Sequence, residues 1–159
     1  MKRIARALAT AGAAAALVVG LTTSAHADGW VTWKHEFSGK CLGFDSLIPL
    51  HPNDVRFYDG CDSYGAQWYE VYNSNDGTYS LKTKENTDAC LTAYWDHDVY
   101  VERCNGNDYQ RWYEVRTSEG WKLKHKATSP SNGPAQYLDG DGRSIYTHDE
   151  NNSRYQLWH

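Results

Sequence analysis

Hydrophobic and polar residues alternate along several short segments of this chain. The segment from Trp121 to Lys126 places aromatic or aliphatic residues between lysines, and valines alternate with polar residues from Val99 to Glu102. Because successive side chains of a strand point to opposite faces of a sheet, this period of two predicts half-buried β-strands. Clusters rich in Gly, Asn, Asp and Ser divide the predicted strands at 73–77, 105–108 and 129–133. After residue 27 no segment has the apolar stripe of an amphipathic helix, so the chain is predicted to be almost wholly β.

The first 27 residues have the pattern of a secretory signal peptide. Three basic residues among the first six precede an apolar stretch over 7–21. Ala25-His26-Ala27 then supplies the small-x-small pattern that signal peptidase cleaves. A transmembrane helix is the alternative, but it needs about 20 apolar residues, more than this stretch contains. We therefore expect cleavage after Ala27, an extracellular protein, no membrane insertion and a single domain over 28–159.

The exported part of the chain is acidic. The leader holds three of the 16 Lys and Arg and none of the 20 Asp and Glu, so 13 basic residues remain against 20 acidic ones, a net charge of −7. Nucleic-acid-binding proteins usually carry a basic face. We therefore expect no nucleic-acid partner, and anionic membranes are disfavoured for the same reason. The net charge does not argue against a neutral ligand.

Three landmarks recur in the same order along the exported part. Tryptophans at positions 68, 112 and 158 each follow a glutamine by one or two residues, and leucines at 42, 91 and 138 lie upstream of them. A strand-like segment opens each copy. Such periodic similarity indicates an internal repeat. The repeats span about 30–73, 74–117 and 118–159.

All four cysteines lie in the exported part, where an even number indicates disulfides. Four cysteines allow three connectivities, and the repeat selects one of them by placing both members of each pair within a single copy. Zinc is the competing interpretation, but the chain has no Cys-x-x-Cys pair. The predicted pairs are Cys41 with Cys61 and Cys90 with Cys104.

Each copy has about four candidate strands, which gives roughly twelve in all. This number and the turn-rich spacing favour a closed or sandwich-like all-β domain. The last copy stops just after Trp158. We expect its final strand to pair with the first copy, because closure removes exposed sheet edges. The three recurring tryptophans are predicted to be core residues.

A Cys-Leu pair, a β-strand and a closing Gln-x-Trp, repeated three times, resemble the ricin-type β-trefoil lectins. The resemblance covers about 30–159 and implies an all-β trefoil of three pseudo-repeats that binds carbohydrate. Three departures stand out. In the first copy the expected Gln is either replaced by Ala66 or shifted by one residue, and in the third Tyr137 and Glu150 stand near the two cysteine positions.

The resemblance also implies one shallow sugar pocket in each repeat, and the third repeat matches this pattern best. There Asp139 stands at the carboxylate position, His148 at the stacking aromatic and Gln156 at the amide, while Tyr155 replaces an Asn. Alternation along the strand places Tyr146 on the face of His148. The alternative interpretation is that the aspartates here only serve an Asp-Gly turn.

The other two repeats match less well. In the first, Gly43 takes the aspartate position, and Asp45 and Tyr58 could form a pocket in its place. A surface ion pair between Asp45 and Arg56 is the alternative there. In the second repeat Thr92 and Glu102 replace the aspartate and the aromatic.

The second repeat also carries Trp95 in a loop over 94–98. This loop could form a divergent site, but because large aromatic side chains are seldom left exposed, we expect Trp95 to fold back onto the barrel.

Other chemistries find little support in the sequence. Three adjacent residues such as Asp96, His97 and Asp98 converge poorly on a metal, and neither Gly-x-Ser-x-Gly nor His-Glu-x-x-His occurs. We therefore expect no metal, no cofactor and no catalysis. The favoured function is a secreted lectin whose partners are glycans or polysaccharides. The alternative is a trefoil that binds a protein partner, as an inhibitor, a toxin-associated subunit or an adaptor.

Overall fold

The computed structural model describes residues 28–46, 54–127 and 133–159. The predicted signal peptide lies outside the described residues. No helix of the described part is long and apolar enough to cross a membrane. The strands are β1 (Gly29–Val31), β2 (Cys41–Phe44), β3 (Val55–Tyr58), β4 (Trp68–Asn73), β5 (Thr78–Thr83), β6 (Ala89–Ala93), β7 (Val99–Arg103), β8 (Trp112–Arg116), β9 (Trp121–His125), β10 (Gln136–Gly140) and β11 (Ile145–Asp149). Short 3-10 helices are η1 (Tyr64–Ala66), η2 (Asp108–Gln110) and η3 (Arg154–Gln156).

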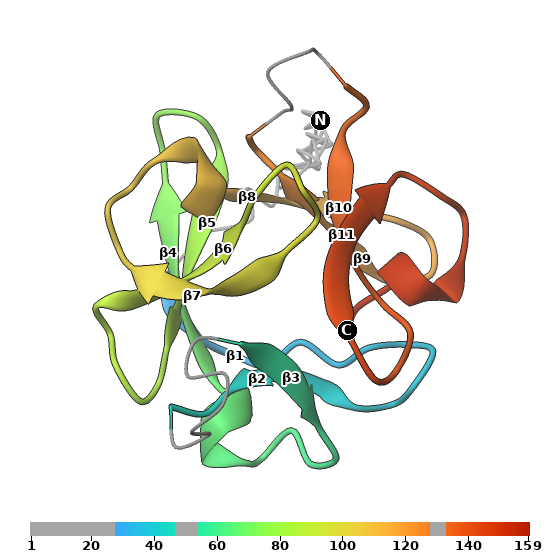
Figure 1. Ribbon diagram of the computed structural model, residues 1–159, viewed down its shortest axis with the longest axis horizontal. Coiled ribbons are helices and arrows are strands. Elements are labelled where there is room, and N and C mark those ends of the chain that lie inside the picture. Colours follow the sequence, from blue (N-terminus) through green and yellow to red (C-terminus); the bar gives the residue numbers. More distant parts are fainter. Residues whose placement is uncertain (1–27, 47–53, 128–132) are drawn as a thin grey trace, which may run out of the picture.

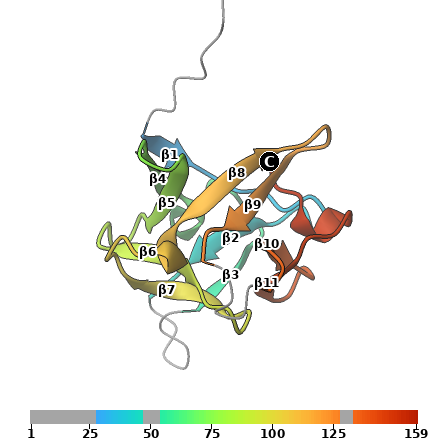
Figure 2. The ribbon, with the colours of Figure 1, turned by 90° about the horizontal axis from the view of Figure 1, so that it is seen from above.

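The strands fall into three consecutive units that surround a common axis (Figure 1). The first strand of each unit, and the fourth strand of the first two units, belong to a barrel. In this barrel β1 pairs with β4, β4 with β5, β5 with β8 and β8 with β9. The second and third strands of each unit pair as the hairpins β2–β3, β6–β7 and β10–β11. Figure 2 shows the barrel strands and the hairpins as two layers. This architecture confirms the predicted all-β trefoil.

The third unit closes the barrel with isolated bridges in place of a twelfth strand. Trp158 bridges Trp121 on one side and His35 on the other. Lys34 and His159 exchange two backbone hydrogen bonds of 2.8 Å. The described residues therefore form eleven strands where about twelve were expected, and the final segment pairs with the first unit as predicted.

The three recurring tryptophans form the centre of the core. Each is 0% exposed. Each indole N–H donates a hydrogen bond of 3.0 to 3.2 Å to a leucine carbonyl on the second strand of its own unit. The pairs are Trp68 with Leu42, Trp112 with Leu91 and Trp158 with Leu138. Because the bond satisfies the one polar group of a buried indole, it offsets the cost of removing that group from water and joins the hairpin to the barrel. The predicted core role is confirmed.

A 3-10 helix precedes each of these tryptophans and resolves the irregular first copy. Its last residue is Gln110 in the second unit, Gln156 in the third and Ala66 in the first. Gln110 accepts from the backbone N–H of Asn105 at 2.8 Å, and Gln156 accepts from that of Asn151 at 3.0 Å. The expected Gln of the first copy is therefore replaced by Ala66 and not shifted by one residue.

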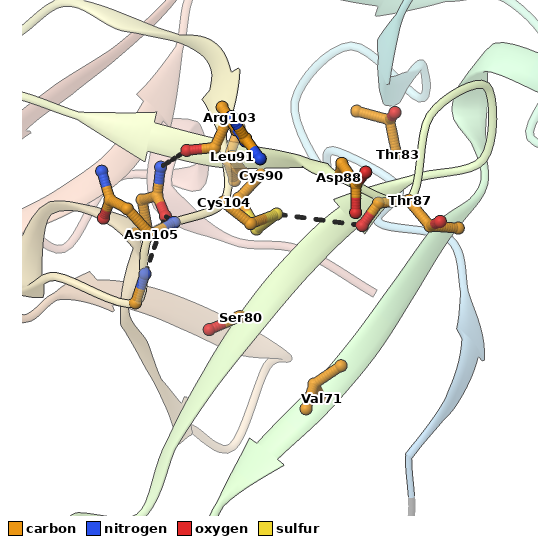
Figure 3. The surroundings of a disulfide bond; sticks show 12 residues. Val71, Ser80, Thr83, Thr87, Asp88, Cys90, Leu91, Arg103, Cys104 and Asn105 are labelled. Carbon is orange, nitrogen blue, oxygen red and sulfur yellow. Dashed lines mark hydrogen bonds between the residues drawn. A yellow bond between two sulfur atoms is a disulfide. The ribbon is translucent and has the colours of Figure 1, made fainter.

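Two disulfides hold the hairpins of the first two units. Cys41 bonds with Cys61 and Cys90 with Cys104, with Cα atoms 5.3 and 5.0 Å apart. Figure 3 shows the second bond, where Cys104 lies beside the carbonyl of Thr87. Both pairings agree with the prediction from the repeat.

Replacing Cys90 and Cys104 together by serine is expected to lower the free energy of unfolding by about 3 kcal/mol. The bond closes a chain segment with a sequence separation of 14, and restricting the unfolded chain in a loop of that length contributes about this much. Urea denaturation of the oxidised parent and the double variant measures the difference. A difference below about 1 kcal/mol would contradict the expectation.

In the third unit a charged cluster lies where the other units have a disulfide. Lys122 donates to Glu150 at 3.2 Å and to the carbonyl of Asn151 at 2.8 Å, and its ammonium lies 5.6 Å from the ring centre of Tyr137. Burial and the nearby Glu150 carboxylate raise the pKa of Tyr137. The alternation had placed Lys122 on the polar face of its strand. It is buried instead, because Glu150 and Asn151 supply partners for its charge.

Candidate functional site

The strand pairings show which residues of the three hairpins occupy corresponding positions. Asp139 lies opposite Tyr146 in the third hairpin. The corresponding pairs are Gly43 with Arg56 in the first hairpin and Thr92 with Tyr100 in the second. Directly opposed residues share a face of the sheet, so each pair marks the same outer face of its hairpin.

Asp139 is the residue of the third hairpin that most needs a partner. Its side chain is 3% exposed, and Oδ2 accepts one long hydrogen bond of 3.3 Å from Nδ2 of Asn151. Oδ1 is buried and makes no hydrogen bond within the described part of the chain. A buried acceptor without a donor is costly, so the site favours a hydroxyl or amide brought from outside.

Tyr146 completes this face together with His148. Burial, followed by the carboxylates of Asp139 and Asp141, raises the pKa of Tyr146 to about 12, so its hydroxyl stays protonated and able to donate. His148 is exposed and lies two residues along the same strand, on the same face. The structure therefore places Asp139, Tyr146 and His148 side by side.

Asp141 serves a turn, as the alternative interpretation held for both aspartates. Its Oδ1 accepts from the backbone N–H groups of Arg143 and Ser144 at 2.8 and 2.7 Å. Asp139 differs, because it lies within β10 and stabilises no turn. The turn interpretation thus holds for Asp141 and fails for Asp139.

Gln156 lies behind the site and has no exposed surface. Its amide donates to the carbonyl of Asp149 at 2.9 Å and accepts from the N–H of Asn151. Its place as a ligand-contacting residue is therefore corrected: it positions the loop that carries Asn151. Asn151 was missed from the sequence, although the Asn-x-Ser spacing of a side-chain-capped turn was a signal for it.

In the first unit the candidate residues satisfy one another. Arg56 pairs with Asp45 and donates to the Tyr58 hydroxyl at 3.1 Å, and that hydroxyl donates to the carbonyl of Phe44. The Tyr58 ring covers Gly43, where a Cβ would meet it at 2.4 Å. The ring thus fills the space that an aspartate side chain would need, and the alternative of an Asp45–Arg56 ion pair describes this unit.

The second unit offers no carboxylate at the equivalent position. Thr92 is buried and donates to the carbonyl of Cys90, and Glu102 accepts from Gln110 at 3.2 Å. Trp95 departs from the prediction that it folds back onto the barrel: it is 51% exposed. Trp95 lies within a tight loop that closes through a hydrogen bond of 3.1 Å from the Tyr94 N–H to the Asp98 carbonyl.

Comparison with known proteins identifies the fold and no sequence family. No family model matches the chain, and no curated protein matches it. Solved structures do match. The designed threefold-symmetric protein ThreeFoil is 22% identical, with a TM-score of 0.66 over 82% of this chain and 96% of that one.

Two natural proteins match in the same way. The β-trefoil lectin of the Vibrio vulnificus hemolysin/cytolysin, with N-acetyl-D-lactosamine bound, is 22% identical with a TM-score of 0.65 over 84% of this chain and 93% of that one. A GlcNAcα1-4Gal-releasing endo-β-galactosidase from Clostridium perfringens is 14% identical with a TM-score of 0.66, over 82% of this chain and 31% of the enzyme. These likenesses establish that the chain has the β-trefoil fold.

Proposed function

We propose that this chain is a secreted, non-catalytic carbohydrate-binding protein of the ricin type, with its main site in the third unit. The observation that carries the proposal is the buried Asp139 carboxylate, whose Oδ1 has no hydrogen-bond partner in the described part of the chain, beside Tyr146 and the exposed His148. A carboxylate acceptor, a phenol donor and an aromatic face are the groups that bind a sugar's hydroxyls and its C–H side.

A non-catalytic role is supported by where the perturbed carboxylates lie. Glycoside hydrolysis needs two carboxyl groups that flank an accessible substrate. Glu70, whose pKa burial raises to about 8, is 7% exposed and hydrogen-bonded to the indole of Trp33 inside the barrel. Asp139, the buried carboxylate of the proposed site, pairs with Asn151, and Asp141 accepts from the backbone of its own turn.

The test is a glycan-array screen of the mature 28–159 protein beside Asp139→Asn. This change keeps the shape of the side chain and removes its charge, so we expect glycan affinity to fall at least about tenfold, because hydrogen bonds to charged groups are the stronger ones. Asp45→Asn is the matched control, since Arg56 already occupies Asp45. Near-ultraviolet circular dichroism verifies that all three proteins are folded.

The control variant also locates the site. Loss of binding in Asp139→Asn alone supports the third unit. Equal binding by the parent and Asp139→Asn would overturn that assignment and direct attention to Asp45 and Tyr58 or to Trp95. A folded, disulfide-bonded parent that bound no glycan would overturn the carbohydrate proposal.

A protein-binding trefoil is the second candidate, and one observation favours it. The sugar position is closed by Tyr58 in the first unit and lacks a carboxylate at Thr92 in the second. A protein with one open site gains little avidity for sugars on its own. This function would follow from an array without glycan binding together with stoichiometric capture of a defined protein.

A further inference from the structure

A groove of about 340 Å³ runs between the second and third units, beside the proposed sugar site. Its walls include Trp95 and His97 from the β6–β7 loop and His148 and Asp149 from β11. Its volume is at the lower end of the range of about 300–1,000 Å³ that small-molecule sites occupy. His148 belongs to both places, because it lines the groove and shares the outer face of Tyr146.

The loop that forms one wall is held firmly. Its backbone closes on itself through the His97 N–H and the Tyr94 carbonyl at 3.2 Å. It is tied to β11 through Thr147, whose N–H donates to the His97 carbonyl at 3.0 Å and whose carbonyl lies 2.8 Å from His97 Nδ1. His97 adopts a φ of 80°, a left-handed conformation that is costly for a residue with a side chain and is found mainly where the surroundings enforce it.

Trp95 is presented at the tip of this loop. It is 51% exposed, whereas the tryptophans of the core are buried. No aromatic or cation contact to its ring occurs among the described residues. Trp30 is equally exposed, but its ring centre lies 5.2 Å from that of Tyr69 in a T-shaped pair and 5.4 Å from the Lys84 ammonium. An indole face that is displayed over a groove and not covered by the chain suits the C–H side of a sugar ring.

The two histidines add hydrogen-bonding groups of defined polarity. Nδ1 of His97 faces the carbonyl of Thr147, and Nδ1 of His148 faces that of Asp149 at 3.2 Å. A carbonyl only accepts, so Nδ1 donates in each ring, and Nε2 is the ring nitrogen left for a ligand. The ring centres lie 6.3 Å apart, and the ring planes are inclined by 30°. Together with the exposed Asp149, which also lines the groove, the two rings give it polar groups that can bind sugar hydroxyls.

We propose that the groove is a second subsite, so that the protein recognises an oligosaccharide of two or more residues and not a single sugar. This inference rests on the proposed function. The terminal sugar contacts Asp139, Tyr146 and His148. The next sugar unit of the glycan packs on Trp95 and hydrogen-bonds to His97. His148 lies between the two subsites.

The test uses an array that carries each terminal monosaccharide beside the disaccharides and trisaccharides that end in it, followed by calorimetry with the soluble forms. We expect the parent to bind at least one disaccharide or trisaccharide more tightly than its terminal monosaccharide. Trp95→Ala should weaken the longer glycan about five- to tenfold and leave the monosaccharide unchanged, since only the longer glycan reaches the indole. Trp30→Ala, an equally exposed tryptophan outside the groove, should change neither affinity.

The outcomes separate this inference from the proposed function. Equal affinity for long and short glycans, or unchanged affinity of the longer glycan in Trp95→Ala, would overturn the second subsite and leave the first standing. Equal losses in Trp95→Ala and Trp30→Ala would overturn it as well. The absence of any glycan binding by the folded parent would overturn both.

Discussion

Replacing Trp112 with alanine is expected to lower the free energy of unfolding by about 3–5 kcal/mol. The side chain is fully buried, its ring packs 4.9 Å from His125, and its indole N–H donates to the Leu91 carbonyl at 3.2 Å. The substitution therefore opens a cavity and leaves a buried carbonyl without its donor. Because domains of this size are stable by only about 5–15 kcal/mol, a large share of the total is lost.

Urea denaturation followed by circular dichroism measures this change. Trp112→Phe helps to separate its two causes, because it removes the hydrogen bond to Leu91 but opens a smaller cavity than alanine does, so its cost should be intermediate. Trp95→Ala is the control and should change stability by less than about 0.5 kcal/mol, as exposed positions usually do. A loss below about 1 kcal/mol for Trp112→Ala would show that Trp112 is not a principal core residue.

Raising the pH from 6.5 to 8 is expected to lower the free energy of unfolding by about 2 kcal/mol through a buried carboxyl pair. Burial, and then the neighbouring Glu114 carboxylate, raise the pKa of Glu70 to about 8. The folded protein therefore holds a proton on Glu70 that the unfolded chain, with an ordinary glutamate pKa near 4.5, has released. The stabilisation is fully present below pH 4.5 and is lost as the pH rises through about 8.

Buried histidines set the choice of pH range. Burial lowers the pKa of His35 and of His125, so both contribute stability that is present above pH 6.5 and lost at lower pH. Between pH 6.5 and 8 these two histidines are neutral in the folded protein, while in the unfolded chain they lose their remaining protons, which adds a smaller change of opposite sign. The difference between the parent and a variant without the Glu70 carboxyl therefore reports the glutamates.

Glu70→Gln is the variant that tests this pair. It should remove most of the slope between pH 6.5 and 8 and retain the hydrogen bond from the Trp33 indole, which Glu70 accepts at 3.1 Å. Glu119→Gln is an exposed control and should keep the parent's slope. A parent whose urea midpoint is constant over this range, or a Glu70→Gln variant with the parent's slope, would contradict the expectation.

Much of this fold could be predicted because its signals are local and repeated. The period of two identified strands, and the three spaced tryptophans identified a core that the structure confirms at Trp68, Trp112 and Trp158. The departures arise from contacts between segments that are distant in the sequence. Lys122 is buried because partners from another segment neutralise it, and the last strand is reduced to bridges at Trp158. The alternation of hydrophobic and polar residues within one segment carries no information about such contacts.

The candidate site shows the same division. The position in the repeat was sufficient to predict that Asp139, Tyr146 and His148 share one face. The position in the repeat did not show whether an amide faces solvent or, like that of Gln156, is hydrogen-bonded to backbone groups near it. It also gave no indication that Trp95 lines a groove with residues of the next unit.

The charged cluster that replaces a disulfide in the third unit makes the three hairpins sensitive to different conditions. A reductant would release the first two hairpins and leave the third intact, whereas high salt would weaken the attraction between Lys122 and Glu150 and leave the disulfides untouched. The cluster reaches the site through one residue: Asn151 accepts from Lys122 by its carbonyl and donates to Asp139 by its side chain. The contact between Asn151 and Asp139 therefore depends on a charged pair, where the corresponding parts of the other two units depend on a disulfide.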